Sequence, residues 1–220
     1  MLTKQRTIYI LIVLIAAVGV FNITAQHMVC DDFYWSLSRA NTTVFYPGML
    51  LGDLAPIVAD YLVIKAGQFW HEGRWYLMPV IYTMVVNVQP SYIDYWSLLG
   101  WLYAFNNAAM VSDEHKEAVL IQKGIKVLQK GVAFHPAAYE LYFDIAWTYF
   151  KKQGDLRRAL LYLERAERHA HPLKVERLKA ITLFRLGRHA DARAVWENYV
   201  AVHPEDEEVR GELERLEKLV

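Results

Sequence analysis

Histidine, cysteine and carboxylate side chains are the groups in this sequence that could bind a metal or catalyse a reaction. Eight histidines are present, but His169 and His171 are two residues apart, which places them on different faces of a helix and disfavours a shared metal ion. His71 and Glu72 lack the second histidine of an H-E-x-x-H zinc helix, and the sequence contains no G-x-S-x-G, Walker A or Rossmann fingerprint. We therefore predict no metal site, no catalytic residue, no cofactor and no small-molecule substrate.

An enzyme stays a remote alternative, with its site in one of two stretches of less regular sequence, 104–122 or 31–58. Neither stretch gathers a nucleophile, a base and an oxyanion donor. Cys30 is the only cysteine, so an internal disulfide and a cysteine-rich zinc site are excluded. The sequence therefore favours a binding or structural role over catalysis.

Charge is balanced over the whole chain but unevenly distributed along it. The 24 Lys and Arg residues match the 24 Asp and Glu residues, so no overall field favours nucleic acid as a partner. Only 5 basic and 6 acidic residues lie in 1–110, whereas 19 and 18 lie in 111–220. Because water-exposed faces carry charge, we expect lipid or other subunits to cover much of the first half; a thicker local core is the alternative.

Residues 7–28 are predicted to form a transmembrane signal-anchor helix. No charged residue lies between Arg6 and Asp31, and this stretch is long enough for a span of about 20 apolar residues. Basic residues precede the span and acidic residues follow it, so the positive-inside bias places residues 1–6 in the cytoplasm. The rest of the chain is then periplasmic, with lipid contact through 7–28.

Three aromatic residues directly follow this stretch and are predicted to lie at the membrane interface: Phe33, Tyr34 and Trp35. Packing of these rings on the first folded helices is the alternative. Cleavage near Ala25 would release a soluble periplasmic peptide-binding module instead. The residues before Ala25 make a poor small-x-small cleavage site, which favours retention of the anchor.

An aromatic and glycine motif in the middle of the chain gives the strongest indication of fold. Trp96, Leu99, Gly100 and Tyr103 are spaced W-x2-L-G-x2-Y. This spacing resembles the first-helix signature of the tetratricopeptide repeat (TPR), a 34-residue pair of helices. Small residues recur at separations of 34, 46 and 34, at Ala66, Gly100, Ala146 and Ala180. The resemblance implies an all-α, right-handed TPR superhelix of about four repeats, with a C-terminal capping helix and one N-terminal transmembrane helix.

The recurring landmarks define the expected boundaries of the repeats. We predict repeats at 59–92, 93–138, 139–172 and 173–206, preceded by a juxtamembrane segment and pre-repeat helix at 29–58 and followed by a capping helix at 207–220. The second repeat carries a 12-residue insertion, which we expect to form a longer, exposed corner between its helices. Turns are predicted at Gly73, Gly154 and Gly187. Residues 151–153 contain one residue more than the repeat pattern has at this place. Lys179 stands at a position where the repeat usually has an apolar residue.

In proteins similar to this one, the first helix of each repeat lines a concave surface. The corresponding positions here are Val63, Trp70, Trp101, Phe105, Phe143, Trp147, Phe150 and Phe184. These side chains form either a groove for an apolar helix or extended peptide, or the interior of a thick superhelix. On the same face, Asp60, Asp94 and Glu140 precede a basic set, Lys174, Arg177 and Arg185. A ligand along the groove would therefore meet opposite charges at its two ends.

These observations predict a membrane-anchored scaffold with protein partners. We expect an accessory subunit of a bacterial envelope or membrane complex, anchored in the inner membrane by a single span, with its TPR domain in the periplasm and no enzymatic activity of its own.

Overall fold

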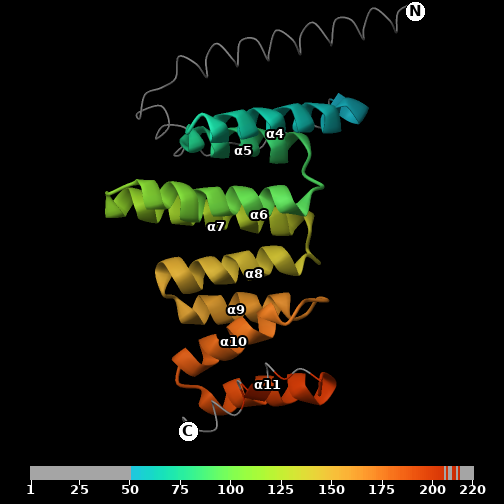
Figure 1. Ribbon diagram of the computed structural model, residues 1–220, viewed down its shortest axis with the longest axis vertical. Helices are drawn as coiled ribbons and strands as arrows, with labels where there is room; N and C mark the ends of the chain where they lie inside the picture. The colour runs from blue at the N-terminus through green and yellow to red at the C-terminus, as the bar shows by residue number, and fades with distance from the viewer. Residues whose placement is uncertain (1–50, 206, 208–209, 212, 214–220) are drawn as a thin grey trace, which may run out of the picture. The chain divides into compact units, whose positions relative to one another are not determined.

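Four helical hairpins follow one another in the computed structural model, which describes residues 51–205, 207, 210–211 and 213. Within these residues every regular element is a helix. The hairpins are α4 (Ala55–His71) with α5 (Met78–Val88), α6 (Ile93–Trp101) with α7 (Glu114–Phe134), α8 (Tyr139–Thr148) with α9 (Leu156–Ala166), and α10 (Lys174–Arg185) with α11 (His189–Val202). Each hairpin packs against the next along the chain, as Figure 1 shows. The described part is therefore a stack of helix pairs.

Three of the hairpins turn at the glycines that the sequence predicts. The φ angles of Gly73, Gly154 and Gly187 are 71°, 63° and 76°, a left-handed conformation that residues with a Cβ rarely adopt. After Gly73, the Arg74 N–H donates back to the Phe69 carbonyl oxygen at 2.8 Å, which satisfies an end group of α4. These three glycines therefore end the first helices of their hairpins.

The 12-residue insertion in the second hairpin lengthens its helices, so the prediction of a longer exposed corner is wrong. The connection is only residues 111–113, and α7 has 21 residues whereas α9 has 11. Before this connection, α6 continues through η3 (Leu102–Asn107) and η4 (Ala108–Met110). Asp113 then caps α7 by accepting the Lys116 N–H at 2.9 Å. The added residues are stabilised as helix because Ala104, Ala108 and Leu120 are completely buried.

Two of the first helices end in a π-helical turn, in which N–H groups bond five residues back and one extra residue fits into the turn. These segments are η3 and η5 (Tyr149–Gln153). The second segment accounts for the surplus residue predicted in 151–153. The extra residue therefore widens the helix and does not interrupt it.

Helices α6 and α7 approach so closely that only glycine fits at their contact. A Cβ on Gly100 would lie 2.5 Å from Leu128 Cγ, and a Cβ on Gly124 would lie 2.7 Å from the Gly100 carbonyl oxygen. The other small landmarks, Ala66, Ala146 and Ala180, are buried to 1% exposure or less, as the repeat pattern predicts. Because Trp101 directly follows Gly100, this helix contact also fixes the position of the Trp101 backbone, from which the indole side chain extends.

The first hairpin begins earlier than predicted. A single 3-10 turn, η1 (Gly52–Leu54), comes first, and α4 starts directly after it at Ala55. Helix α4 therefore begins before residue 59, the expected start of the first repeat. At the other end, Leu213 packs against the buried pair Ala180 and Trp196.

The predicted span 7–28 and the aromatic residues Phe33, Tyr34 and Trp35 lie outside the described residues. Between residues 51 and 213, no described helix is both long and apolar enough to cross a bilayer.

Candidate partner-binding face

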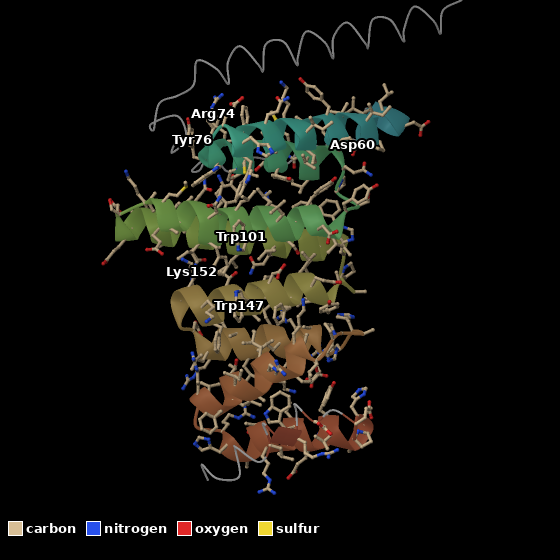
Figure 2. The ribbon with its side chains drawn as sticks, in the orientation of Figure 1. Asp60, Arg74, Tyr76, Trp101, Trp147 and Lys152 are labelled. Carbon is tan, nitrogen blue, oxygen red and sulfur yellow. The ribbon has the colours of Figure 1, made fainter. Side chains whose placement is uncertain are left out.

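An open cleft of about 340 Å³ lies between the first helices of the second and third hairpins, which contact each other directly. Its walls carry two indole rings, Trp101 from α6 and Trp147 from α8, and Figure 2 shows both labelled residues in the middle of the stack. We call this space the α6–α8 cleft. Its lining consists of Asp94, Ser97, Leu98, Trp101, Phe105, Leu128, Asp144, Trp147 and Thr148.

A row of aromatic rings runs along α8 beside this cleft. Trp147 stacks with Phe143 at a centroid distance of 6.4 Å and with Phe150 at 6.1 Å, with ring planes within 16° of parallel. The spacings of four and three residues put these side chains on one face of the helix. The row therefore holds the Trp147 ring in place from both sides, which presents a preorganised apolar surface to the cleft.

Basic side chains cover several of these rings. Lys151 Nζ lies 5.0 Å from the Trp147 ring centroid, and Lys152 Nζ lies 5.5 Å from that of Phe105. Both distances are within the range of cation–π attraction. Lys174 and Arg185 from α10 lie over Phe143 and Phe150 at 4.7 and 4.6 Å. Basic side chains from η5 and from both ends of α10 therefore border the aromatic row.

Acidic side chains lie nearer the N-terminal ends of α6 and α8. Asp94 is exposed, whereas Asp144 is partly buried in the cleft wall. Burial is the largest influence on the pKa of Asp144 and raises it above 3.8. A hydrogen bond from Ser97 and the charge of Lys174 lower that pKa, but burial outweighs them. The cleft thus contains a carboxylate that its apolar surroundings solvate poorly.

The predicted face is partly open and partly core. Trp70 and Trp101 are 49% and 47% exposed, and Phe150 is buried. The other predicted residues, Val63, Phe105, Phe143, Trp147 and Phe184, are partly buried. The structure brings Trp101, Phe105 and Trp147 together in the cleft and places Phe143 and Phe150 beside it.

Three of the predicted residues lie away from this cleft and from the aromatic row beside it. Trp70 pairs with Trp75 near the end of α4, where the ring centroids are 5.8 Å apart and Trp75 Nε1 donates to the Trp70 carbonyl oxygen. Phe184 contacts the His189 ring edge-on at 4.5 Å within the last hairpin. Val63 lies on α4, in the first hairpin.

Sequence reasoning placed Asp94 on this face but missed two other polar residues of the cleft, Ser97 and Asp144. Ser97 and Asp144 lie four residues before Trp101 and three before Trp147, so helical spacing alone places each on the same face as its indole. That spacing is the signal that could have found them.

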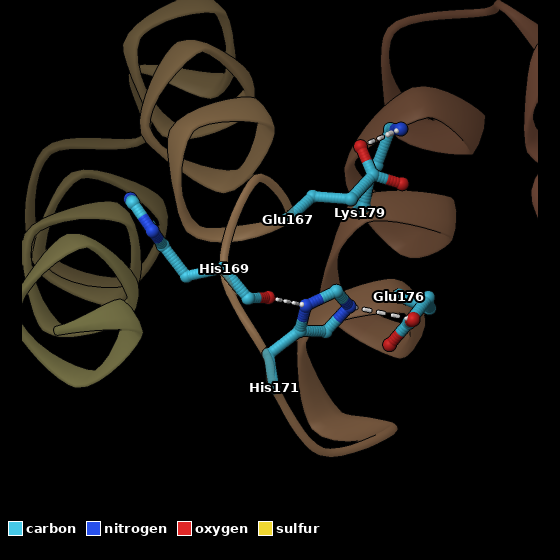
Figure 3. Close-up of polar contacts among 5 residues, drawn as sticks. All are labelled: Glu167, His169, His171, Glu176 and Lys179. Carbon is cyan, nitrogen blue, oxygen red and sulfur yellow. Dashed lines mark hydrogen bonds and ion pairs between the residues drawn. The ribbon is translucent and has the colours of Figure 1, made fainter. Parts of the chain in front are cut away.

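The two neighbouring histidines lie in the connection between α9 and α10, so the assumption that they sit on a helix is wrong. Figure 3 shows His171 between two acceptors: Nδ1 contacts the His169 carbonyl oxygen, and Nε2 lies 2.7 Å from Glu176 Oε1. The protonated imidazolium ring can donate to both of these acceptors at once. These contacts accordingly raise the pKa of His171, although burial alone would lower it.

A second ion pair in the same region explains Lys179, which replaces a usual apolar residue. Its Nζ contacts Glu167 Oε2 at 2.5 Å and joins α10 to the end of α9 (Figure 3). Among the described residues, no group of three or more His, Cys, Asp or Glu side chains could hold a metal ion.

No protein-family model and no curated protein matches this chain. Among solved structures, MamA from AMB-1 matches with a TM-score of 0.50 and 18% identity, over 74% of this chain and 83% of that chain. A protein described as a thermophilic TPR protein in Thermus thermophilus matches with a TM-score of 0.49 and 13% identity, over 72% of this chain and 98% of that chain. Together with the stacked hairpins and their glycine turns, the match to MamA, a TPR protein, shows a TPR-like fold. The all-helical, TPR-like character expected from the W-x2-L-G-x2-Y motif is confirmed.

Proposed function

We propose that this chain is a protein–protein interaction scaffold that holds a segment of a partner protein on the face formed by α6 and α8. The α6–α8 cleft carries the proposal, because it combines an open apolar volume with indole rings from two successive hairpins. Aromatic anchors in a desolvated pocket are the usual energetic centre of a protein interface. The TPR-like fold supports this reading, since such stacks expose extended surfaces for other polypeptides.

Substitution of the exposed indole tests the proposal. Trp101→Ala is expected to weaken partner binding by about 2 kcal/mol or more, which is about thirtyfold in Kd, with little change in melting temperature. Trp70→Ala is the matched control, because its indole is equally exposed but lies outside the cleft. Trp147→Ala is less informative, since loss of its two ring contacts is expected to lower the melting temperature as well.

The measurement uses the full chain, extracted in mild detergent and compared with both variants. Co-purifying proteins are identified and quantified for each form. A partner retained by the wild type and by Trp70→Ala but lost from Trp101→Ala supports the proposal. If every co-purifying protein binds Trp101→Ala as well as the wild type, the cleft is not the binding site.

We further propose that the scaffold is anchored in a bacterial inner membrane through residues 7–28 and that its repeats are periplasmic. The uncharged stretch before Asp31 and the basic residues before it support this proposal. A protein of this kind acts as an accessory subunit of an envelope assembly and carries out no reaction itself.

The N-terminal sequence of the mature protein tests the anchor. A start at the first residues, together with resistance of the chain to alkaline extraction from membranes, supports a retained span. A start directly after Ala25 removes the tether and leaves a soluble periplasmic peptide-binding module with the same cleft.

A further inference from the structure

Two carboxylates give the α6–α8 cleft a charge that a purely apolar groove would not have. Asp94 belongs to α6 and Asp144 to α8, so the acidic groups reach the cleft from both walls. The rest of the lining is largely apolar, with two indoles, a phenyl ring and two leucines. In such surroundings an ionised carboxylate loses hydration, and a cation brought beside it recovers much of that loss.

The aromatic walls favour the same type of ligand. A Lys or Arg side chain can place its aliphatic stem along an indole and its charge over the ring face, and Trp is the strongest aromatic partner for such contacts. The chain itself uses this contact at Lys151, which lies over the Trp147 ring. An acidic ligand side chain at the same place would be repelled by both carboxylates.

The nearby basic residues of the chain border the cleft but are not among its lining residues. Lys152 lies over Phe105, and Lys174 lies over Phe143, with a second contact to Tyr139 at 5.4 Å. Lys174 attracts Asp144 but does not outweigh the effect of burial on that carboxyl group. Lys174 therefore borders the acidic part of the cleft, whereas the lining itself holds both carboxylates and no Lys or Arg.

We infer that the α6–α8 cleft recognises a Lys or Arg side chain on the bound segment, held between Trp101 and Trp147 and paired with Asp94 and Asp144. This inference rests on the proposed function, since it specifies the chemistry of the segment that the scaffold holds. The occupant is a polypeptide with a basic residue flanked by apolar ones.

A library of random peptides displayed on phage, selected on the detergent-purified full chain, tests this inference. Peptides selected by the wild type are expected to be enriched in Lys or Arg next to apolar residues. The Asp94→Asn, Asp144→Asn double variant is expected to lose that enrichment and to keep the apolar preference. Glu164→Gln, an exposed substitution on α9 outside the cleft lining, is the control and is expected to select like the wild type.

A double-mutant cycle on one selected peptide then measures the contact directly. Replacing the basic residue by norleucine is expected to raise the Kd for the wild type about tenfold and for the double variant less than about threefold. Equal losses for both proteins overturn the inference. Selected peptides that depend on Trp101 but show no basic preference also overturn it, and they leave the proposed function intact. If no selected peptide depends on Trp101, both the inference and the proposed function fail.

Discussion

The close contact between α6 and α7 predicts that Gly124→Ala destabilises the protein, although alanine is the better helix former. A Cβ at this position would lie 2.7 Å from the Gly100 carbonyl oxygen, 2.8 Å from Ala104 Cβ and 3.1 Å from the Ala104 nitrogen. Two of these atoms belong to the backbone, so no side-chain rotation relieves the contact. The two helices must therefore move apart.

The expected size of the effect follows from two opposing contributions. Replacing glycine by alanine inside a helix stabilises by about 1 kcal/mol, whereas overpacking costs up to about 3 kcal/mol when the neighbours cannot adjust. The net loss is therefore about 2 kcal/mol. For a chain of this size, that corresponds to a decrease in melting temperature of about 4–8 °C.

Gly67→Ala is the matched control, because Gly67 lies inside α4 and a Cβ there would meet nothing within 4 Å. It is expected to stabilise by about 0.5–1 kcal/mol. Thermal unfolding of the full chain, followed by far-ultraviolet circular dichroism, compares both variants with the wild type. If Gly124→Ala melts at or above the temperature of Gly67→Ala, the two helices do not approach as described, and the position inferred for Trp101 loses its basis.

Three further predictions concern stability. Because the folded-state pKa of His171 is raised above 6.5, its protonated form stabilises the fold, and this stabilisation is lost as pH rises through the folded pKa; His171→Gln should remove that pH dependence from the free energy of unfolding measured in urea. The raised pKa of Asp144 acts at acidic pH, where ionisation of the buried carboxyl group lowers stability as pH rises from 3.8 through the folded-state pKa. Asp144→Asn should therefore weaken the pH dependence of the free energy of unfolding in this acidic range. An unchanged pH dependence would contradict the described burial. Asp113→Ala removes the cap that accepts the Lys116 N–H and should lower the melting temperature, whereas Glu164→Gln should leave it unchanged.

The fold could be predicted from the sequence because its landmarks are local. A glycine at a helix end permits a left-handed backbone conformation, and a small residue at a helix contact permits close packing. Gly73 and Gly100 therefore predict a turn and a helix contact from local sequence alone. The prediction of an exposed corner is wrong because adjacent asparagines, here Asn106 and Asn107, usually favour the end of a helix. Burial of the neighbouring Ala104 and Ala108 overrides that local preference, and burial depends on α7, which is distant in sequence.

The candidate site was only partly predictable for a similar reason. Large aromatic residues are recognisable as candidate binding residues from the sequence. Trp101 and Trp147 also follow directly after the small residues that mark the repeats. Asp144 does not stand out in the sequence, because its role comes from the apolar surroundings that two different helices provide. A carboxylate gains an unusual environment only when the hairpins have packed.

The π-helical turns bear on how such a repeat can change during evolution. Insertion of a single residue into a helix usually rotates all later side chains around the helix axis, so that buried residues would turn away from the neighbouring helices. In η5 the additional residue is confined to one widened turn, and Gly154 still ends the helix as its counterparts do in other hairpins. The length of a first helix can therefore change by one residue while the next helix keeps its alignment in the stack, so insertions of this size need not disrupt the packing of the hairpins.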